Sequence, residues 1–552
     1  MYNMAISRRE FLAQSSLFGA ALLLPPSVKA FSSLSGSPVD WTAISPITLL
    51  NSFKSSDVIT GDTPDEAHDI FWSKDNFIKK KGGLPKAHEN YDVVIVGGGL
   101  SALTAAYYLT RENKKVVILE GHPRLGGNAK AERFKNSYMG LGSAYIVTPE
   151  EGGDIDQFLK EIGVSKKFRK MSHDSDAIGL NGKIISGFWE GNTDPKNRDQ
   201  FVKAHEILNN VYENAYPDLP LYPDQEVDLG LLHRLDRMRF QDWVEQEIPD
   251  IHPHIEEYFH QYCWSSFGCG YDEVSAAQAL NFITSDLQGI EAMPGGNAGI
   301  AEGIFQAIKN KNIAFKTTAF CVDIQETSSG VYVCYHENNQ VLNAVTGKKC
   351  IVTAPKMVAK KLIDKLSTDQ FKAMDSITYH AYLVGNVILN RKIEPKYYDV
   401  YSLKGDLPRS EREDSTKRVF TDITTADWAN PREAERSALT LYMPLPYAMA
   451  QQFLFSPMLY SKYDERVRTA LAPFMNDLGL NWSDIDGLRL TRYGHALPVA
   501  QTGGIASGLF ERASRSINDK IFFANQDNWG NPCFETSYAV GKVAAQKVSR
   551  LI

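Results

Sequence analysis

The sequence predicts an α/β protein in which a domain built on a parallel sheet is interleaved with a second, α+β lobe. Two observations support this fold class. Residues 91–120 read as a complete strand, helix and strand, with glycines at the first turn. Two later segments, 294–355 and 521–545, again combine buried strands with a glycine-opened or small-residue helix. Because long helical and mixed stretches separate these segments, we expect the chain to leave the first domain and return to it twice.

The first segment carries a dinucleotide-binding pattern. Its first strand, 93–96, is short, apolar and β-branched, and the pattern G-x-G-x-x-A follows at once. The first glycine permits a sharp turn, the second lets a pyrophosphate reach the amides at a helix N-terminus, and the alanine allows close packing of helix on strand. The second strand ends on an acid placed to accept ribose hydroxyls, which an ordinary glycine turn does not need. The predicted cofactor-binding residues are Gly97, Gly99, Leu100, Ser101, Ala102, Glu120 and Gly121.

A second glycine pair follows the acid. Arg124, Gly126, Gly127 and Asn128 resemble the R-x-G-G motif of the flavin amine oxidase superfamily, in which the motif lies beside the pyrophosphate and ribityl chain of FAD. The family usually has arginine where this chain has Asn128, which weakens a phosphate contact but leaves the close approach that glycines provide. The resemblance therefore implies FAD rather than NAD, with these four residues among its contacts.

The resemblance covers roughly residues 90–552. In its middle part a strand backbone touches the adenine, and Val322 matches that position. Near the C-terminus an acid at a strand end binds the ribityl chain; Asp527 is the candidate, with Gln526 as the alternative because the family sets its acid one place earlier. The helix that follows would point its N-terminus at the flavin, with Cys533, Phe534 and Ser537 as contacts. The implied fold is a Rossmann-like FAD-binding domain of the amine oxidase and glutathione reductase type, with an interleaved α+β substrate domain.

The domain boundaries follow from these segments. Residues 1–30 are predicted to be a signal peptide and 31–89 an N-terminal extension that wraps the body. The FAD-binding domain is predicted to comprise 90–150, 289–360 and 487–552, and the substrate domain 151–288 and 361–486.

The N-terminus predicts export in a folded state. Residues 7–12, SRREFL, resemble the twin-arginine signal, and an apolar stretch of about 14 residues follows, too short and too interrupted to span a bilayer. Recognition by the twin-arginine export machinery would place a flavin-loaded protein in the periplasm. The net charge of −7 and the lack of a long basic run argue against nucleic acid as a partner.

The catalytic candidates lie just before and within the last FAD segment. Arg492, Tyr493 and His495 precede the final strand and Trp529 follows it. Tyr493 and Trp529 could flank the flavin and orient an amine, while His495 takes the proton that an ammonium must lose. The chain is most similar to the bacterial spermidine dehydrogenase branch of the superfamily. However, Arg492 would repel a polyamine and attract a carboxylate, so an amino acid or another small amine remains an equal alternative.

Two rival functions stay open. A carotenoid-desaturase-like or porphyrinogen-oxidase-like flavoprotein would act on a large apolar substrate, and a flavin-fold binding protein would not turn over at all. The electron acceptor could be oxygen, a quinone or a cytochrome. The resemblance to spermidine dehydrogenases also raises a haem, which would be non-covalent because the sequence has no C-x-x-C-H motif.

Overall fold

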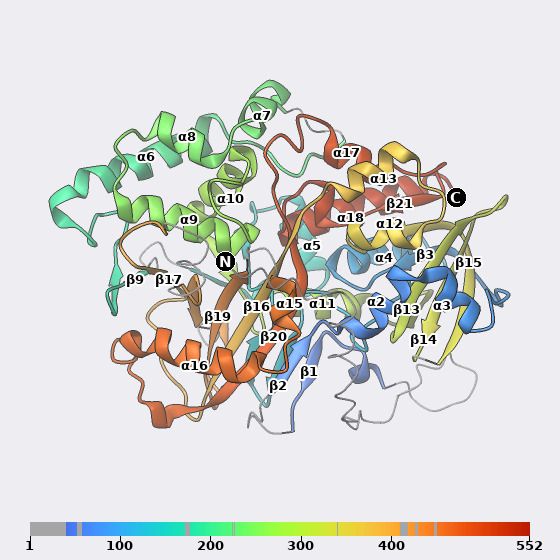
Figure 1. Ribbon diagram of the computed structural model, residues 1–552, viewed down its shortest axis with the longest axis horizontal. Helices are drawn as coiled ribbons and strands as arrows, with labels where there is room; N and C mark the ends of the chain where they lie inside the picture. Colours follow the sequence, from blue (N-terminus) through green and yellow to red (C-terminus); the bar gives the residue numbers. More distant parts are fainter. Residues whose placement is uncertain are drawn as a thin grey trace, which may run out of the picture. The chain divides into compact units, whose positions relative to one another are not determined.

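The computed structural model describes residues 40–552, apart from 52–57, 172–176, 224, 226, 339, 409–417, 426–428 and 446–449. The twin-arginine motif therefore lies outside the described residues. Two large sheets and the helices around them organise the described part of the chain (Figure 1). Among the helices of these ranges, none combines the length and the apolar character that a membrane crossing requires.

The first sheet joins the three segments that carry the glycine patterns. Its order is β12-β4-β3-β15-β14-β13, with β21 beside β15. Strands β12, β4, β3, β15 and β21 pair in parallel, whereas β13, β14 and β15 form an antiparallel meander. The buried strands predicted for residues 294–355 are therefore present, and two of them form a hairpin. The bounds are β3 (Glu89–Val96), β4 (Val116–Leu119), β12 (Ile313–Lys316), β13 (Ala319–Glu326), β14 (Val331–Glu337), β15 (Val341–Val352) and β21 (Ile521–Phe523).

Helices from the beginning, middle and end of the chain pack on this sheet. Helix α4 (Leu100–Arg111) contacts α11 (Ala298–Ile308) and α18 (Phe534–Ser549). The α4–α18 contact is close, because a Cβ on Gly541 would lie 2.5 Å from the carbonyl oxygen of Ser101. Ala102 is fully buried in the same apolar cluster, as its place in the glycine pattern predicts.

The second sheet has the order β10-β9-β17-β18-β19-β16-β20-β2. One face packs its leucines and methionines against α16 (Leu459–Leu471). The opposite face carries Tyr382, Tyr442 and Tyr493, and we call it the tyrosine face. The bounds are β2 (Val58–Gly61), β9 (Ala177–Leu180), β10 (Lys183–Ser186), β16 (Tyr379–Leu389), β17 (Asp399–Leu403), β18 (Asp422–Thr425), β19 (Ala438–Leu445) and β20 (Ile485–Pro498).

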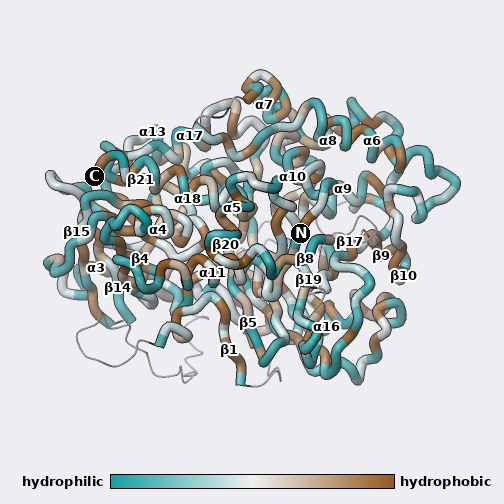
Figure 2. The backbone as a smooth tube through the Cα atoms, turned by 180° about the vertical axis from the view of Figure 1, so that it is seen from behind, coloured by the Kyte–Doolittle hydropathy of each residue, from teal (hydrophilic) through white to brown (hydrophobic). Residues whose placement is uncertain are grey.

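A group of helices adjoins the second sheet through α9, which contacts β17 and β19. Helix α6 alternates between hydrophobic and hydrophilic residues along its length (Figure 2), as expected for a helix that buries one face. Helix α9 ends at Gly268 in the left-handed conformation, so the predicted glycine stop is present. The bounds are α5 (Asp154–Glu161), α6 (Arg198–Asn214), α7 (Leu229–Asp236), α8 (Phe240–Glu247), α9 (Pro253–Phe267) and α10 (Ala276–Gln288).

Shorter elements complete the described chain. The small sheets are β1-β5-β6, built from β1 (Ile47–Leu49), β5 (Ala131–Phe134) and β6 (Ser137–Gly140), and β7-β11-β8, built from β7 (Tyr145–Val147), β11 (Ile290–Ala292) and β8 (Arg169–Lys170). The remaining helices are α2 (Pro64–Trp72), α3 (Lys74–Lys80), α12 (Lys356–Leu362), α13 (Thr368–Asp375), α15 (Ala450–Leu454), α16 as above and α17 (Leu509–Ser514).

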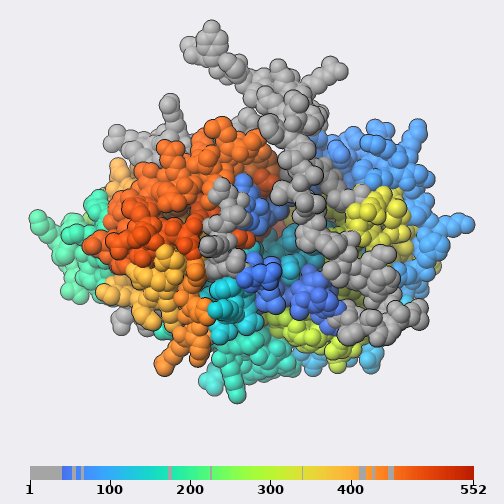
Figure 3. All heavy atoms as spheres, turned by 90° about the horizontal axis from the view of Figure 1, so that it is seen from below, coloured from blue at the N-terminus to red at the C-terminus, as the bar shows by residue number. Residues whose placement is uncertain are grey.

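The pairing of the strands moves one predicted domain boundary. Strand β20 pairs with β16 along most of its length, so residues up to Pro498 belong to the second sheet rather than to the last FAD segment predicted from 487. Strand β2 pairs in parallel with β20 and joins the N-terminal extension to the same sheet. In Figure 3 dark blue residues of this extension reach the surface beside the orange and red residues of the C-terminal half.

Candidate active site

The ends of three strands from distant parts of the sequence meet at one point. The amide and the hydroxyl of Thr353, just after β15, both donate to the carbonyl of Val96 at the end of β3, at 2.8 and 2.9 Å. The side chain of Asn525, just after β21, donates to the carbonyl of Thr353 at 2.8 Å. The predicted convergence of the three segments is therefore confirmed.

Two glycine loops form a cradle at this point. Gly97 has φ +107°, and a Cβ there would lie 2.4 Å from the hydroxyl of Thr353. Gly99 precedes the first turn of α4. The amide of Gly126 donates to Gly98 at 2.8 Å, and a Cβ on Gly127 would lie 3.0 Å from the Cα of Gly99. The loops approach each other this closely only because they lack side chains, which leaves helix-terminal amides open to a pyrophosphate.

The acid of the pattern turns back toward the first loop. The carboxylate of Glu120 accepts the amide of His122 at 2.7 Å, and a Cβ on Gly98 would lie 2.9 Å from one of its oxygens. Burial raises the pKa of Glu120, while the nearby Lys130 lowers it. A carboxylate in this place can accept ribose hydroxyls, so the cradle and the acid together fit the adenosine half of FAD. Gly121 is required next to it because a Cβ there would lie 2.8 Å from the Phe320 ring.

Arg124 has a different role from the predicted one. Its guanidinium donates to the carbonyls of Thr42 and Ser45 at 2.9 and 3.3 Å, so it fastens the N-terminal extension to the glycine loop instead of meeting a phosphate. Asn128 is exposed and donates to the carbonyl of Ala496 at 3.3 Å, which joins the same loop to β20.

Val322 lies at a bulge in β13, where the ladder with β14 shifts register. Its side chain is fully buried with Ile70 and Leu342. The predicted backbone contact with adenine stays a prediction.

The prediction that Asp527 binds the ribityl chain is wrong. One of its carboxylate oxygens pairs with the ammonium of Lys356, and the other accepts the Lys356 amide and the Tyr379 hydroxyl, both at 2.7 Å. Both members of the ion pair are fully buried. Burial lowers the pKa of Lys356, and Asp527 opposes that shift. Gln526, the alternative, is half-buried and comes one place earlier, as the family pattern requires.

The final helix begins as predicted beside the cradle. Cys533 caps α18, since its sulfur accepts the amide of Thr536 at 3.4 Å. Phe534 and Ser537 are buried in the first turns. In the same turn Glu535 accepts the amide of Val147 at 3.0 Å, which holds the helix N-terminus against β7.

Comparisons with known proteins agree with this geometry. Residues 95–162 match the family model described as NAD(P)-binding Rossmann-like domain. The chain is 23% identical to oxidoreductase PigB of Serratia sp. over 83% of this chain and 75% of that protein. It is 26% identical to a probable flavin-containing monoamine oxidase A of Dictyostelium discoideum over 40% of this chain and 49% of that protein. A putrescine oxidase variant has the same fold, with a TM-score of 0.64 and 13% identity over 84% of this chain and 100% of the other.

The chain is similar in sequence and in fold to flavin amine oxidases. Its cofactor is accordingly FAD, and it is an FAD-dependent oxidoreductase. The matched regions of the monoamine oxidase and of (S)-6-hydroxynicotine oxidase from Paenarthrobacter nicotinovorans span only about half of those relatives, 49% and 51%. Across the described ranges, no group of three or more His, Cys, Asp or Glu residues is placed to hold a metal ion.

The substrate side of this amine oxidase fold separates two of the predicted catalytic residues. Tyr493 lies on the tyrosine face, where its hydroxyl donates to the carbonyl of Leu141 at 2.7 Å and burial raises its pKa. Arg492 points elsewhere, and its predicted catalytic role is wrong. It donates to the carbonyls of Asp62 and Leu454 at 2.9 and 3.0 Å, and its guanidinium stacks 4.6 Å from the ring of Phe455.

His495 and Trp529 both lie where the lobes meet. The His495 ring is exposed, yet the surrounding protein lowers its pKa by desolvation, with Asp62 raising it and His68 lowering it. Trp529 packs between the apolar cluster of the FAD domain and that of the helical region. The predicted aromatic pair of Tyr493 and Trp529 stays a prediction.

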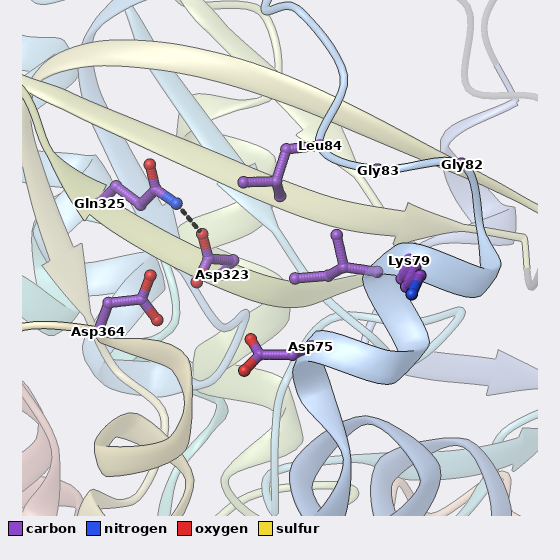
Figure 4. A pocket seen from close by; sticks show the side chains of 9 residues that line it. Asp75, Lys79, Gly82, Gly83, Leu84, Asp323, Gln325 and Asp364 are labelled. Carbon is purple, nitrogen blue, oxygen red and sulfur yellow. Dashed lines mark hydrogen bonds between the residues drawn. The ribbon is translucent and has the colours of Figure 1, made fainter.

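One surface pocket lies away from these residues. It measures about 600 Å³ and lies between α3 and β13 (Figure 4). Its carboxylates are Asp75, Asp323 and Asp364, and the ammonium of Lys74 bridges the last two. Gln325 also donates to Asp323 at 2.8 Å, as the dashed line in Figure 4 marks. Asp323 and Asp364 are thus already paired with Lys74, and the pocket lies apart from the flavin site.

Proposed function

We propose that this flavoprotein oxidises the carbon next to the nitrogen of a small cationic amine. The observation that carries the proposal is the tyrosine face, whose strand β20 is joined to the second glycine loop by the hydrogen bond from Asn128 to Ala496. This face carries the buried carboxyl group of Asp422 further along. Tyrosine rings and a carboxylate suit an organic ammonium. A large apolar substrate would gain nothing from that carboxyl group, which already accepts the hydroxyls of Ser265 and Thr421.

FAD, when bound in the cradle, would supply the hydride acceptor for this reaction. The protein's part is to remove a proton first, because an ammonium has no lone pair to support hydride loss. Desolvation keeps His495 neutral, so its free ring nitrogen can accept that proton. Hydride loss then leaves an iminium ion on the substrate, which water hydrolyses to an aldehyde or ketone and ammonia or an amine.

An amino acid substrate is disfavoured. Its carboxylate needs a cationic partner, and Arg492 was the candidate. Because the Arg492 guanidinium is committed to two backbone carbonyls and the ring of Phe455, it is turned away from the tyrosine face. The names of the relatives do not decide the point, since they include a monoamine oxidase and a 6-hydroxynicotine oxidase but also L-amino-acid oxidases.

The test is anaerobic addition of candidate substrates to purified protein containing FAD. We expect primary amines to bleach the visible flavin absorbance, and carotenes or porphyrinogens to leave it unchanged. Bleaching by apolar substrates alone would overturn the proposal. Re-oxidation of the bleached protein by oxygen, by a soluble quinone or by a cytochrome then identifies the electron acceptor.

The cellular location is part of the same proposal. The residues SRREFL support folded export by the twin-arginine route and a periplasmic enzyme. Replacing Arg8 and Arg9 by lysine should retain the protein in the cytoplasmic fraction, while an unchanged distribution would contradict export by this route.

A further inference from the structure

Strand β20 bulges at His495. The strand is in register with β16 at Tyr493 and again at Leu497, but the register shifts between these positions, where a single residue of β16 is opposite three residues of β20. The three are Gly494, His495 and Ala496. Extra residues in one strand interrupt the ladder and redirect side chains, and such bulges are common next to active sites. His495 is the middle residue of this bulge, and its ring is exposed.

A carboxylate from the N-terminal extension holds the residue before His495. Strand β2 pairs with β20 as far as Gly61, which is opposite Arg492. The next residue, Asp62, donates its amide to the carbonyl of Arg492 at 2.9 Å, and its side chain accepts the amide of Gly494 at 2.8 Å. Because backbone groups two residues apart on a strand point to the same side, the Asp62 carboxylate continues the ladder where β2 ends. It is the partner that the amide at the start of the bulge needs.

The extension can reach this position only through a glycine. Gly61 has φ +94°, and a Cβ there would lie 2.1 Å from the carbonyl oxygen of Arg492. A side chain at this residue would push the extension away from β20, and Asp62 would move with it. The sequence Gly61-Asp62 therefore combines a close approach to β20 with a carboxylate for the bulge.

The residue after His495 is held from the FAD side. The side-chain amide of Asn128 donates to the carbonyl of Ala496 at 3.3 Å. Asn128 directly follows Gly127, on which a Cβ would lie 3.0 Å from the Cα of Gly99 in the first glycine loop. The position at which the flavin amine oxidase pattern usually has arginine thus connects the bulge to the cradle in this chain.

The charges around His495 are of both signs. Desolvation lowers the pKa of His495, Asp62 opposes this shift and His68 adds to it. The other charged or titratable groups that face His495 or Asp62 are His68 on α2, Lys130, Arg492 and Tyr493. Asp62 is the anion in this group, so it favours the protonated form of the His495 ring.

We propose that Asp62 of the N-terminal extension and Asn128 of the second glycine loop are positioning residues, which hold the bulge of β20 so that His495 can take the proton of the substrate amine. The assignment rests on the proposed function, in which His495 is the proton acceptor. Asp62 acts in two ways, because its oxygen fixes the backbone before His495 and its negative charge stabilises the protonated ring. The N-terminal extension is thereby a working part of the active site.

Two variants of Asp62 separate its two effects. Asp62→Asn keeps an oxygen for the amide of Gly494 but removes the charge. The acid limb of its kcat/KM profile with hexylamine should move to lower pH by about half a unit at low ionic strength, with the plateau kcat nearly unchanged. Asp62→Ala also removes the oxygen, and its plateau kcat should fall about tenfold with little change in KM, because the ring is no longer held in place.

Asn128→Ala tests the other side of the bulge. It should lower kcat as Asp62→Ala does, but it should leave the acid limb where it is in the wild type, because no charge is removed. The flavin-to-protein ratio should also stay at the wild-type value, since the neighbouring glycines make the cradle.

Titration of the His495 ring gives a measurement that does not depend on turnover. In FAD-bound protein with isotope-labelled histidine, the NMR signal that disappears in His495→Gln is that of His495. Its midpoint should move to lower pH in Asp62→Asn, since Asp62 raises the pKa of His495.

The matched control is Asp477→Asn. Asp477 is exposed like Asp62, and its carboxylate also accepts a strand amide at 2.8 Å, that of Ile184. Ile184 lies on β10, at the opposite edge of the same sheet. This variant should change neither the acid limb nor kcat. An equal shift in Asp477→Asn would mean that the limb follows the net charge, and it would overturn the role given to Asp62.

The outcomes separate the two proposals. If no amine bleaches the flavin, or if His495→Gln keeps the acid limb, the proposed function fails. If His495→Gln loses the limb while both Asp62 variants keep the wild-type profile and kcat, His495 stands as the proton acceptor and positioning by Asp62 is wrong. A wild-type kcat in Asn128→Ala would likewise show that Asn128 does not position His495.

Discussion

The FAD end of the site is made of backbone, whereas the substrate end is made of side chains. At the FAD end, glycine loops approach within van der Waals contact and leave helix amides exposed, so the binding surface exists where side chains are missing. At the substrate end, tyrosines and carboxyl groups from several strands and helices line a small acidic cavity. The backbone of the FAD end fixes the shape of the cofactor that can bind. At the substrate end, single substitutions can change which substrate is preferred.

The largest expected effect comes from a fully buried ion pair at the FAD end. Lys356→Met should reduce the free energy of unfolding by about 3–5 kcal/mol, because it leaves the Asp527 side chain buried without its cationic partner. Chemical denaturation of the FAD-bound protein measures this loss. Lys360→Met on the same helix is the control, since its partner Asp375 is largely exposed and the change should be small. Equal losses for both variants would contradict a special role for the buried pair.

The next prediction tests whether missing side chains make the cradle. Gly97→Ala should weaken FAD binding about a hundredfold, since the methyl group would overlap Thr353 and a positive φ strains alanine. The flavin-to-protein ratio after dialysis measures the loss. Gly82→Ala is matched to it, with φ +96° and no atom within 4 Å of the added carbon, and should keep its FAD. Flavin retained by Gly97→Ala would show that the close approach is not required.

The same contrast explains which parts of the site could be predicted. The cradle residues Gly97, Gly99 and Gly126 were predictable because a backbone requirement fixes a residue type at a fixed spacing. The pairing of Lys356 with Asp527 joins residues 171 positions apart, and nothing local to either one indicates it. Assigning Asp527 to the flavin was wrong because shifting by one position in a tight turn redirects the side chain from the ligand to the core.

The cavity at the substrate end escaped prediction for a related reason. The residues that line the small cavity, such as Asp286 on α10 and Tyr401 on β17, come from separate elements, and only the fold brings them together. The error at Arg492 was avoidable. Arg492, Tyr493 and His495 were placed ahead of the last strand without a strand of their own, but they lie in β20, where successive side chains project to opposite faces. Because Tyr493 projects from the tyrosine face, the side chain of the preceding residue, Arg492, projects from the opposite face.

A smaller effect is expected where the two ends meet. His495→Gln should lower kcat/KM for amines roughly tenfold to a hundredfold, the usual contribution of a positioned base. The pH profile carries the sharper test. Desolvation lowers the pKa of His495, so the wild-type kcat/KM should fall only as the pH drops through that lowered value, when the ring takes up a proton. The variant should lose this acid limb. An unchanged profile would mean that His495 does not accept the substrate proton.

The smallest expected effect is at Arg492. This prediction tests whether the Arg492 guanidinium lies outside the substrate site. Arg492→Leu removes hydrogen bonds to the carbonyls of Asp62 and Leu454 and the stack on Phe455, so it should cost about 1 kcal/mol of stability. It should change the KM for amines less than about threefold, because a guanidinium facing β2 and α15 neither repels an ammonium nor binds a carboxylate. Parallel kinetics with hexylamine and an amino acid measure both possibilities. A large fall in the KM for hexylamine, or a rise in KM for the amino acid alone, would mean that the Arg492 charge lies inside the site. An amino acid would then again be a candidate substrate.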